Sequence, residues 1–138
     1  MQLAYYYVGL SAALTVLLWV PYILARLVAW GLPAFLHNYP EGFPVKRQER
    51  PLWVERSQRA HLNMVETLPA FIGVVLAAAY LAGDDAAAVQ QLALWSAVFF
   101  WARLAHAAVY TLGIPYLRTP AYLLSWLAIL AIALQVVV

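Results

Sequence analysis

Apolar and polar residues alternate along this chain in long blocks. Four blocks contain no Asp, Glu, Lys or Arg, and they cover Leu3–Ala25, Thr67–Gly83, Ala86–Ala102 and Thr119–Val138. A helix needs roughly 20 residues to cross the hydrocarbon core, so the two middle blocks must extend into their polar flanks. The pattern therefore predicts a single domain over residues 1–138, with transmembrane helices at about 3–30, 51–82, 85–111 and 118–137.

The composition indicates the same class of protein. Hydrophobic residues make up 66% of the chain and charged residues 10%, against about 25% charged in a soluble domain. We therefore expect an all-α, integral membrane four-helix bundle with lipid as a partner and no nucleic acid. The chain has no cysteine, which excludes a protein thiolate nucleophile or a cysteine-bound metal. Its three histidines lack the paired spacing of a metal site, so no metal is expected.

Charges between the apolar blocks predict the orientation of the helices. The connection Gly83-Asp84-Asp85 is short enough to require a tight helical hairpin. The other two connections hold the cations Lys46, Arg47, Arg50, Arg56, Arg59 and Arg118. By the positive-inside rule these two connections are cytoplasmic and both termini lie outside, in the periplasm if the protein is in a bacterial inner membrane. Gly31–Pro51 is rich in proline and is predicted to be a cytoplasmic loop and not a helix.

A polar stripe runs along the start of the second helix. At about 100° per residue, the spacing of Arg56, Arg59, Asn63 and Glu66 places all four within about 80° of one another. Ionisable groups at membrane depth are costly and indicate a functional site. A structural network between helices is the alternative for Arg59, Asn63 and Glu66. For Arg56 and the loop cations we favour contact with lipid headgroups, and for His61, off the stripe, a packing or interface role.

The third helix carries a second polar face, formed by Arg103, His106 and Tyr110. With it, every predicted helix brings arginine to the cytoplasmic level: Arg26, Arg56, Arg59, Arg103 and Arg118. A guanidinium presents a fixed fork of donors that matches a carboxylate. These arginines favour a small, multiply carboxylated ligand, with an amine that Glu66 could bind.

Two runs resemble one known family. Glu55–Glu66, followed by Thr67–Phe71, is similar to the second-helix signature of the MAPEG family, the membrane-associated proteins of eicosanoid and glutathione metabolism. The specific part is the spacing Arg-x2-Arg-x3-Asn-x2-Glu. Arg103–Tyr110 resembles the family's third-helix segment, and chain length and helix number also agree. The resemblance, closest to a bacterial-type member, implies a homotrimer that binds glutathione between neighbouring subunits at the cytoplasmic side.

The same resemblance implies roles for individual residues. The expected glutathione-binding residues are Arg26, Arg59, Asn63, Glu66, Arg103, His106 and Tyr110. Arg118 is expected beside the sulfur, where a guanidinium stabilises the thiolate, the reactive form of a thiol. Tyr110 is the alternative residue for that role. Leu62 and Thr67 depart from the residues of the family's eicosanoid-converting members, so eicosanoid specificity is not implied.

Three functions from different classes remain open at this point. The first is a glutathione-dependent transferase or peroxidase, with glutathione as co-substrate and a hydrophobic electrophile or peroxide dissolved in the bilayer. The second is a non-catalytic scaffold or regulator with the same four helices. The third is a haem-binding membrane protein that uses His61 and His106 as ligands. The sequence leaves the electrophile open, and another low-molecular-weight thiol could replace glutathione.

Overall fold

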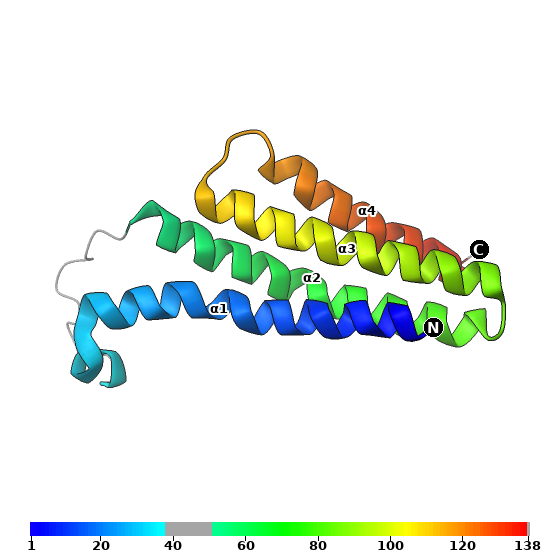
Figure 1. Ribbon diagram of the computed structural model, residues 1–138, viewed down its shortest axis with the longest axis horizontal. Helices are drawn as coiled ribbons and strands as arrows, with labels where there is room; N and C mark the ends of the chain where they lie inside the picture. The colour runs from blue at the N-terminus through cyan, green and yellow to red at the C-terminus, as the bar shows by residue number, and fades with distance from the viewer. Residues whose placement is uncertain (38–50, 138) are drawn as a thin grey trace.

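A computed structural model describes residues 1–37 and 51–137 of the 138-residue chain. It contains four helices, namely α1 (Gln2–Leu36), α2 (Leu52–Ala82), α3 (Ala86–Leu112) and α4 (Arg118–Val137). The helices lie side by side in one elongated bundle (Figure 1). All four are long and apolar enough to cross a membrane. The predicted all-α class with four membrane-spanning helices is therefore confirmed.

The connection between α2 and α3 forms the tight hairpin that its length predicts (Figure 1). Gly83 ends α2 with a positive φ of 49°, a backbone angle that favours glycine. Asp85 then caps α3, because its Oδ1 accepts hydrogen bonds from the backbone N–H of Ala87 at 2.8 Å and of Ala88 at 3.3 Å. A carboxylate at a helix N-terminus satisfies free N–H groups and offsets the positive end of the helix dipole.

The first helix runs further than the sequence predicts. Residues 32–36 are helical, so the loop interpretation of Gly31–Pro51 is wrong for this part. The helix is interrupted at Gly31, where φ is 74° and ψ is 159°, and it resumes at once. Pro33 falls in the first turn after the break, where its missing N–H breaks no helical hydrogen bond. Lys46, Arg47 and Arg50 lie outside the described residues.

The core lies mainly between α2, α3 and α4. Its centre is a stacked pair, Phe71 of α2 and Phe99 of α3, with ring centroids 3.8 Å apart. Ile132 of α4 is fully buried in the same cluster. Helix α1 packs on α2 and α3, and α4 packs on the same two helices, but no Cα of α1 comes within 8 Å of one in α4. Helices α1 and α4 therefore lie on different sides of the bundle.

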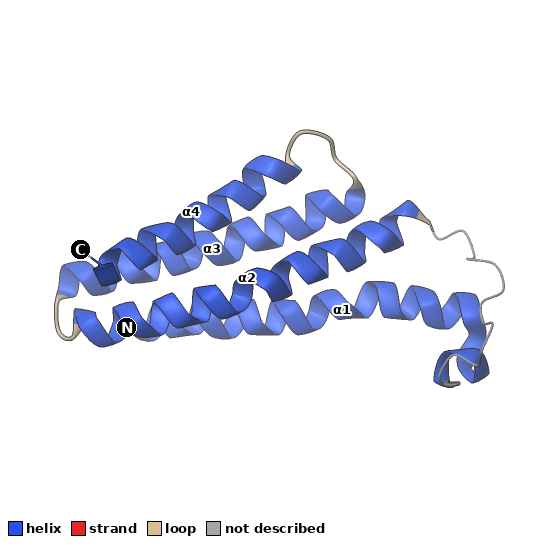
Figure 2. Ribbon diagram, turned by 180° about the vertical axis from the view of Figure 1, so that it is seen from behind, coloured by secondary structure: helices blue, strands red, loops and turns tan. Residues whose placement is uncertain are grey.

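The two ends of the bundle differ in charge. Figure 2 shows the α2–α3 hairpin and both termini at one end, and the start of α2 and the α3–α4 connection at the other. The second end carries Arg56, Arg59 and Arg118, and we call it the cationic end. The hairpin end carries Asp84 and Asp85, both exposed. This distribution places the predicted site residues toward one membrane surface.

Candidate functional site

A cavity of about 490 Å³ opens at the cationic end, between the start of α2, the end of α3 and the start of α4. Its volume falls in the range of small-molecule pockets. The lining residues are Leu52, Glu55, Arg56, Arg59, Val109, Tyr110, Gly113, Ile114, Pro115, Tyr116, Arg118 and Thr119. Three guanidinium groups face one carboxylate in this set, so the cavity favours an anionic ligand.

Arg118 and Tyr110 meet across this cavity. Tyr110 belongs to the last turn of α3, and Arg118 is the first residue of α4. The Arg118 guanidinium carbon lies 5.2 Å from the centroid of the Tyr110 ring, a cation–π contact. Because Arg118 is exposed, its guanidinium N–H groups remain available to a ligand. A ligand in this cavity can therefore meet both the charged guanidinium of Arg118 and the hydroxyl of Tyr110.

Behind Tyr110, a row of aromatic and cationic side chains continues into the bundle. The His106 ring is buried, with its centroid 5.5 Å from that of Tyr110 and 5.8 Å from that of Tyr122. The Arg103 guanidinium carbon lies 5.5 Å from the Tyr122 centroid. Tyr122 was missed by the sequence reasoning. Its signal was its position four residues after Arg118, which places both on one face of α4.

Arg103 is the most deeply buried charged residue of this row, with 1% of its surface exposed. Its Nε donates to the sulfur of Met64 at 3.3 Å, but its Nη1 and Nη2 are buried without a hydrogen-bond partner. Buried donors without acceptors are destabilising, and a buried charge without a counter-ion more so. The two terminal NH2 groups of Arg103 thus have no acceptor among the described residues, and Glu66 of α2 attracts its charge.

A separate polar cluster joins α1 to α2. The Arg26 Nη2 donates to Gln58 Oε1 at 2.7 Å, and the Arg26 guanidinium carbon lies 5.3 Å from the Tyr22 ring centroid. The Tyr22 hydroxyl and His61 Nδ1 form a 2.9 Å hydrogen bond. His61 thus has the packing role predicted for it.

The polar stripe of α2 makes no side-chain hydrogen bond to another helix in the described part of the chain. Asn63 Nδ2 donates to the backbone oxygen of Arg59 at 3.1 Å, within the same helix. The side chains of Arg59 and Glu66 are exposed. The negative charge of Glu66 attracts the buried guanidinium of Arg103 on α3.

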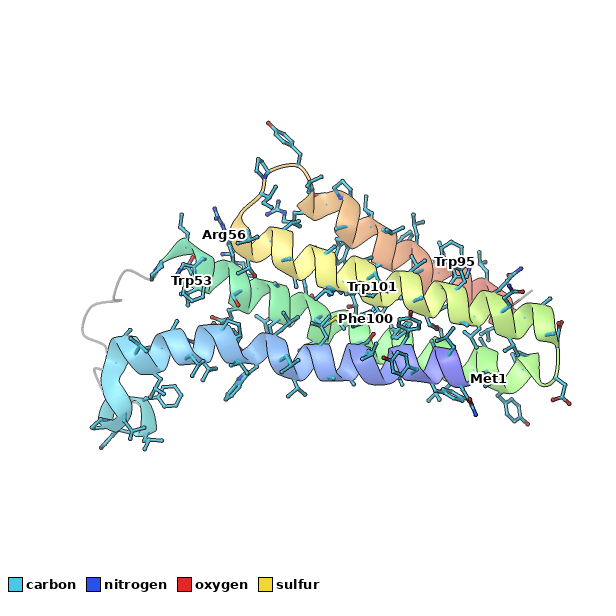
Figure 3. The ribbon with its side chains drawn as sticks, in the orientation of Figure 1. Met1, Trp53, Arg56, Trp95, Phe100 and Trp101 are labelled. Atoms are coloured by element: carbon cyan, nitrogen blue, oxygen red, sulfur yellow. The ribbon has the colours of Figure 1, made fainter. Side chains whose placement is uncertain are left out.

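The predicted site residues therefore fall into three groups. Arg59, Tyr110 and Arg118 line the cavity, and His106 and Arg103 lie behind it. The remaining predicted residues, Arg26, Asn63 and Glu66, are not part of its lining. Arg56, which the sequence assigned to lipid headgroups, lines the cavity, and Figure 3 shows it extending from the start of α2 beside the end of α3. Among residues 1–37 and 51–137, no cluster of His, Asp or Glu could hold a metal ion.

Fold and cavity together define an integral membrane protein of four helices with an arginine-lined cavity at one end. The family model of the MAPEG family matches residues 4–138, essentially the whole chain, and the chain belongs to that family. The family includes glutathione transferases and peroxidases, and also non-catalytic members. No curated protein matches the chain.

Proposed function

We propose that this protein is a glutathione-dependent membrane transferase or peroxidase. The observation that carries the proposal is the pairing of Arg118 and Tyr110 in a cavity that two further arginines line. Family membership supports glutathione as the co-substrate. In the transferase reaction, the glutathione sulfur forms a bond to an electrophilic carbon and the displaced group leaves with the electron pair. The second substrate is a hydrophobic molecule dissolved in the bilayer.

Arg118 acts on the thiol through its charge. A thiol with a pKa of about 8.5 is mostly protonated at pH 7, while the thiolate is the nucleophile. A guanidinium remains charged at this pH, so its proximity stabilises the thiolate relative to the thiol. The Tyr110 hydroxyl is the other candidate donor to the sulfur. Its ring, in contact with Arg118, also helps to hold the guanidinium in place.

The remaining predicted residues bind the two ends of the peptide. Arg26, Arg59 and Arg103 serve the carboxylates and Glu66 the amine, while Asn63 and His106 supply further polar contacts. Arg26 lies on α1, which packs on α2 and α3 but not on α4, the helix that carries Arg118. A neighbouring copy whose α1 lies against this α4 supplies Arg26 to the ligand. We infer a homotrimer with glutathione between adjacent subunits, in line with the apolar surfaces that α1 and α4 expose.

The orientation follows from the charges. With the cationic end in the cytoplasmic leaflet, both termini lie outside, or in the periplasm of a bacterial cell. Glutathione then enters from the cytoplasm, and the electrophile arrives laterally from the bilayer. Binding both reactants in one place converts an encounter between two phases into a local reaction.

The test uses the near-ultraviolet absorbance of bound thiolate in purified protein. Wild-type protein should show this absorbance when glutathione is added, and should turn over chlorodinitrobenzene. Arg118→Ala should keep most of its glutathione affinity, because other residues bind the peptide ends, but should lose the absorbance and most turnover. Arg118→Lys should restore only part of both, since an ammonium is a point charge and not a planar fork.

Tyr110→Phe identifies which group stabilises the sulfur. If Tyr110 provides the essential hydrogen bond, this variant loses the thiolate absorbance and Arg118→Ala does not. An apparent thiol pKa that is unchanged in both variants would contradict thiolate stabilisation by either residue.

A further inference from the structure

The Arg56 side chain rests directly on Gly113, the residue that ends α3. A Cβ atom built on Gly113 would overlap the Arg56 guanidinium, and its three nearest neighbours would be Nη1, Cζ and Nη2 of that one group. Gly113 also has a φ of 73°, in the left-handed region. Glycine is therefore favoured at position 113 for two reasons. It adopts the positive φ easily, and it has no Cβ atom that would overlap the Arg56 guanidinium.

Other glycines with positive φ lack such a neighbour. Gly83, at the end of α2, has a φ of 49° and no atom within 4 Å of its ideal Cβ position. At Gly31 the nearest atom is a proline carbon at 3.9 Å. The contact at Gly113 is therefore not a general consequence of a helix-ending glycine.

The end of α3 provides a favourable place for a cation. The last carbonyl groups of a helix carry partial negative charge. Here the backbone N–H of Gly113 is bonded to the carbonyl of Tyr110 at 3.1 Å, and that of Ile114 to the carbonyl of Val109 at 3.0 Å. Arg56 is half-buried beside this turn. The helix end and the absence of a Cβ together fix the position of its guanidinium.

Once placed, the guanidinium still has its hydrogen-bonding capacity. None of the hydrogen bonds formed between described side chains involves Arg56, and a guanidinium carries five N–H donors. It lines the same cavity as Arg59 and Arg118. Among the described residues nothing occupies its donors, so they can meet an anionic group that enters the cavity.

We propose that Arg56 is an anion-binding residue of this cavity, positioned by Gly113, and that it binds a carboxylate of glutathione. The proposal rests on the proposed function for the identity of the ligand. The alternative is that Arg56 contacts the phosphate of a lipid headgroup. A phosphate, like a carboxylate, is an anion that accepts hydrogen bonds from a guanidinium. A planar fork held against a rigid turn suits a carboxylate, because both N–H···O bonds can form without ordering a flexible side chain.

The test compares glutathione affinities by calorimetry in nanodiscs of zwitterionic lipid. Arg56→Gln should weaken binding at least about tenfold, as expected for loss of a hydrogen bond to a charged group. Gly113→Ala should cause a similar loss, because its methyl group displaces the guanidinium from this position. Gly83→Ala is the matched control, with the same substitution at positive φ and no guanidinium nearby, and should leave affinity unchanged. Adding Gly113→Ala to Arg56→Gln should cause little further loss.

Two further comparisons identify the group that Arg56 binds. With the two mono-esters of glutathione, one at each carboxylate, the difference between wild type and Arg56→Gln should vanish for one ester and persist for the other. A difference that persists for both would overturn the carboxylate contact. An effect of Arg56→Gln that occurs only when anionic lipid is added would assign Arg56 to the headgroups instead.

The failures of the two proposals can be separated. Wild-type protein that binds no glutathione would contradict the proposed function itself. Wild-type protein that binds glutathione with the same affinity as Arg56→Gln would overturn only the role of Arg56. Equal losses in Gly113→Ala and Gly83→Ala would show that backbone strain, and not displacement of the guanidinium, is responsible. If Gly113→Ala does not fold, the affinity of Arg56→Gln and the comparison of the two mono-esters still test whether Arg56 binds a carboxylate of glutathione.

Discussion

Arg103 combines deep burial with two charged nitrogen atoms that have no hydrogen-bond partner. Such a residue lowers the stability of the empty protein unless an anion compensates it. Replacing a buried charge by an apolar side chain of similar length is often neutral or stabilising. We therefore predict that Arg103 serves ligand binding more than it serves stability.

Arg103→Met provides the corresponding test. Without glutathione, we expect the variant to unfold at the same temperature as wild type or slightly higher, because Met64 and the Tyr122 ring offer apolar contacts at this site. With glutathione, the rise in unfolding temperature should be smaller than in wild type, since stabilisation by a ligand follows its affinity. Thermal unfolding in one detergent, with and without glutathione, measures both. Clear destabilisation of the empty variant would assign Arg103 a structural role.

At the residue level, the sequence could assign side chains to helix faces but not to a cavity. Of the α2 stripe, Arg56 and Arg59 line the cavity, whereas Asn63 and Glu66 do not. The difference was not predictable, because periodicity does not tell which part of another helix lies opposite. Arg56 and Gly113 are more than fifty residues apart in the chain. Their contact depends on how far α2 is shifted along its axis relative to α3.

At the scale of the helices, the cluster of Tyr22, His61, Arg26 and Gln58 fixes α1 against α2. Polar contacts between membrane helices contribute modestly, about 0.6 kcal/mol on average and about 1.7 kcal/mol at most. Helix α1 exposes many apolar side chains, so these contacts help to determine its rotation about its own axis.

Tyr22→Phe removes one of these contacts without changing the shape of the side chain. We expect a loss of about 0.6 kcal/mol in the free energy of unfolding, measured by denaturant titration in mixed micelles. Tyr80→Phe is the control, because Tyr80 is 86% exposed and its hydroxyl has no comparable partner among the described residues. Equal stabilities of the two variants would show that the Tyr22–His61 hydrogen bond does not stabilise the bundle.

The helices themselves were largely predictable. The four apolar blocks predicted the four helices, because a helix that spans a membrane needs a long apolar segment. The short Gly83–Asp85 connection predicted the hairpin. Residues 32–36 were missed since prolines were taken to exclude a helix. Pro33 instead begins a new helical turn after Gly31, and this distinction depends on one glycine with a positive φ.

At the scale of the whole molecule, the separation of α1 from α4 within one protomer is the main structural argument for assembly. Native mass spectrometry from detergent should give a trimer, and glutathione should be retained by the trimer. A stable monomer that binds glutathione with full affinity would contradict the shared site. The sequence alone could suggest this assembly only through the family, because it does not show that the two helices lie apart.

We propose that this protein binds glutathione at the cationic end of its bundle. Calorimetric titration of the purified protein with glutathione tests this binding, with Arg59→Ala as the site variant and Asp84→Asn, at the hairpin end, as the control. We predict saturable binding by wild type and the Asp84 variant, at no more than one glutathione per subunit, and much weaker binding by the Arg59 variant. Wild-type heats equal to those of buffer alone, or an affinity that Arg59→Ala leaves unchanged, would contradict the claim.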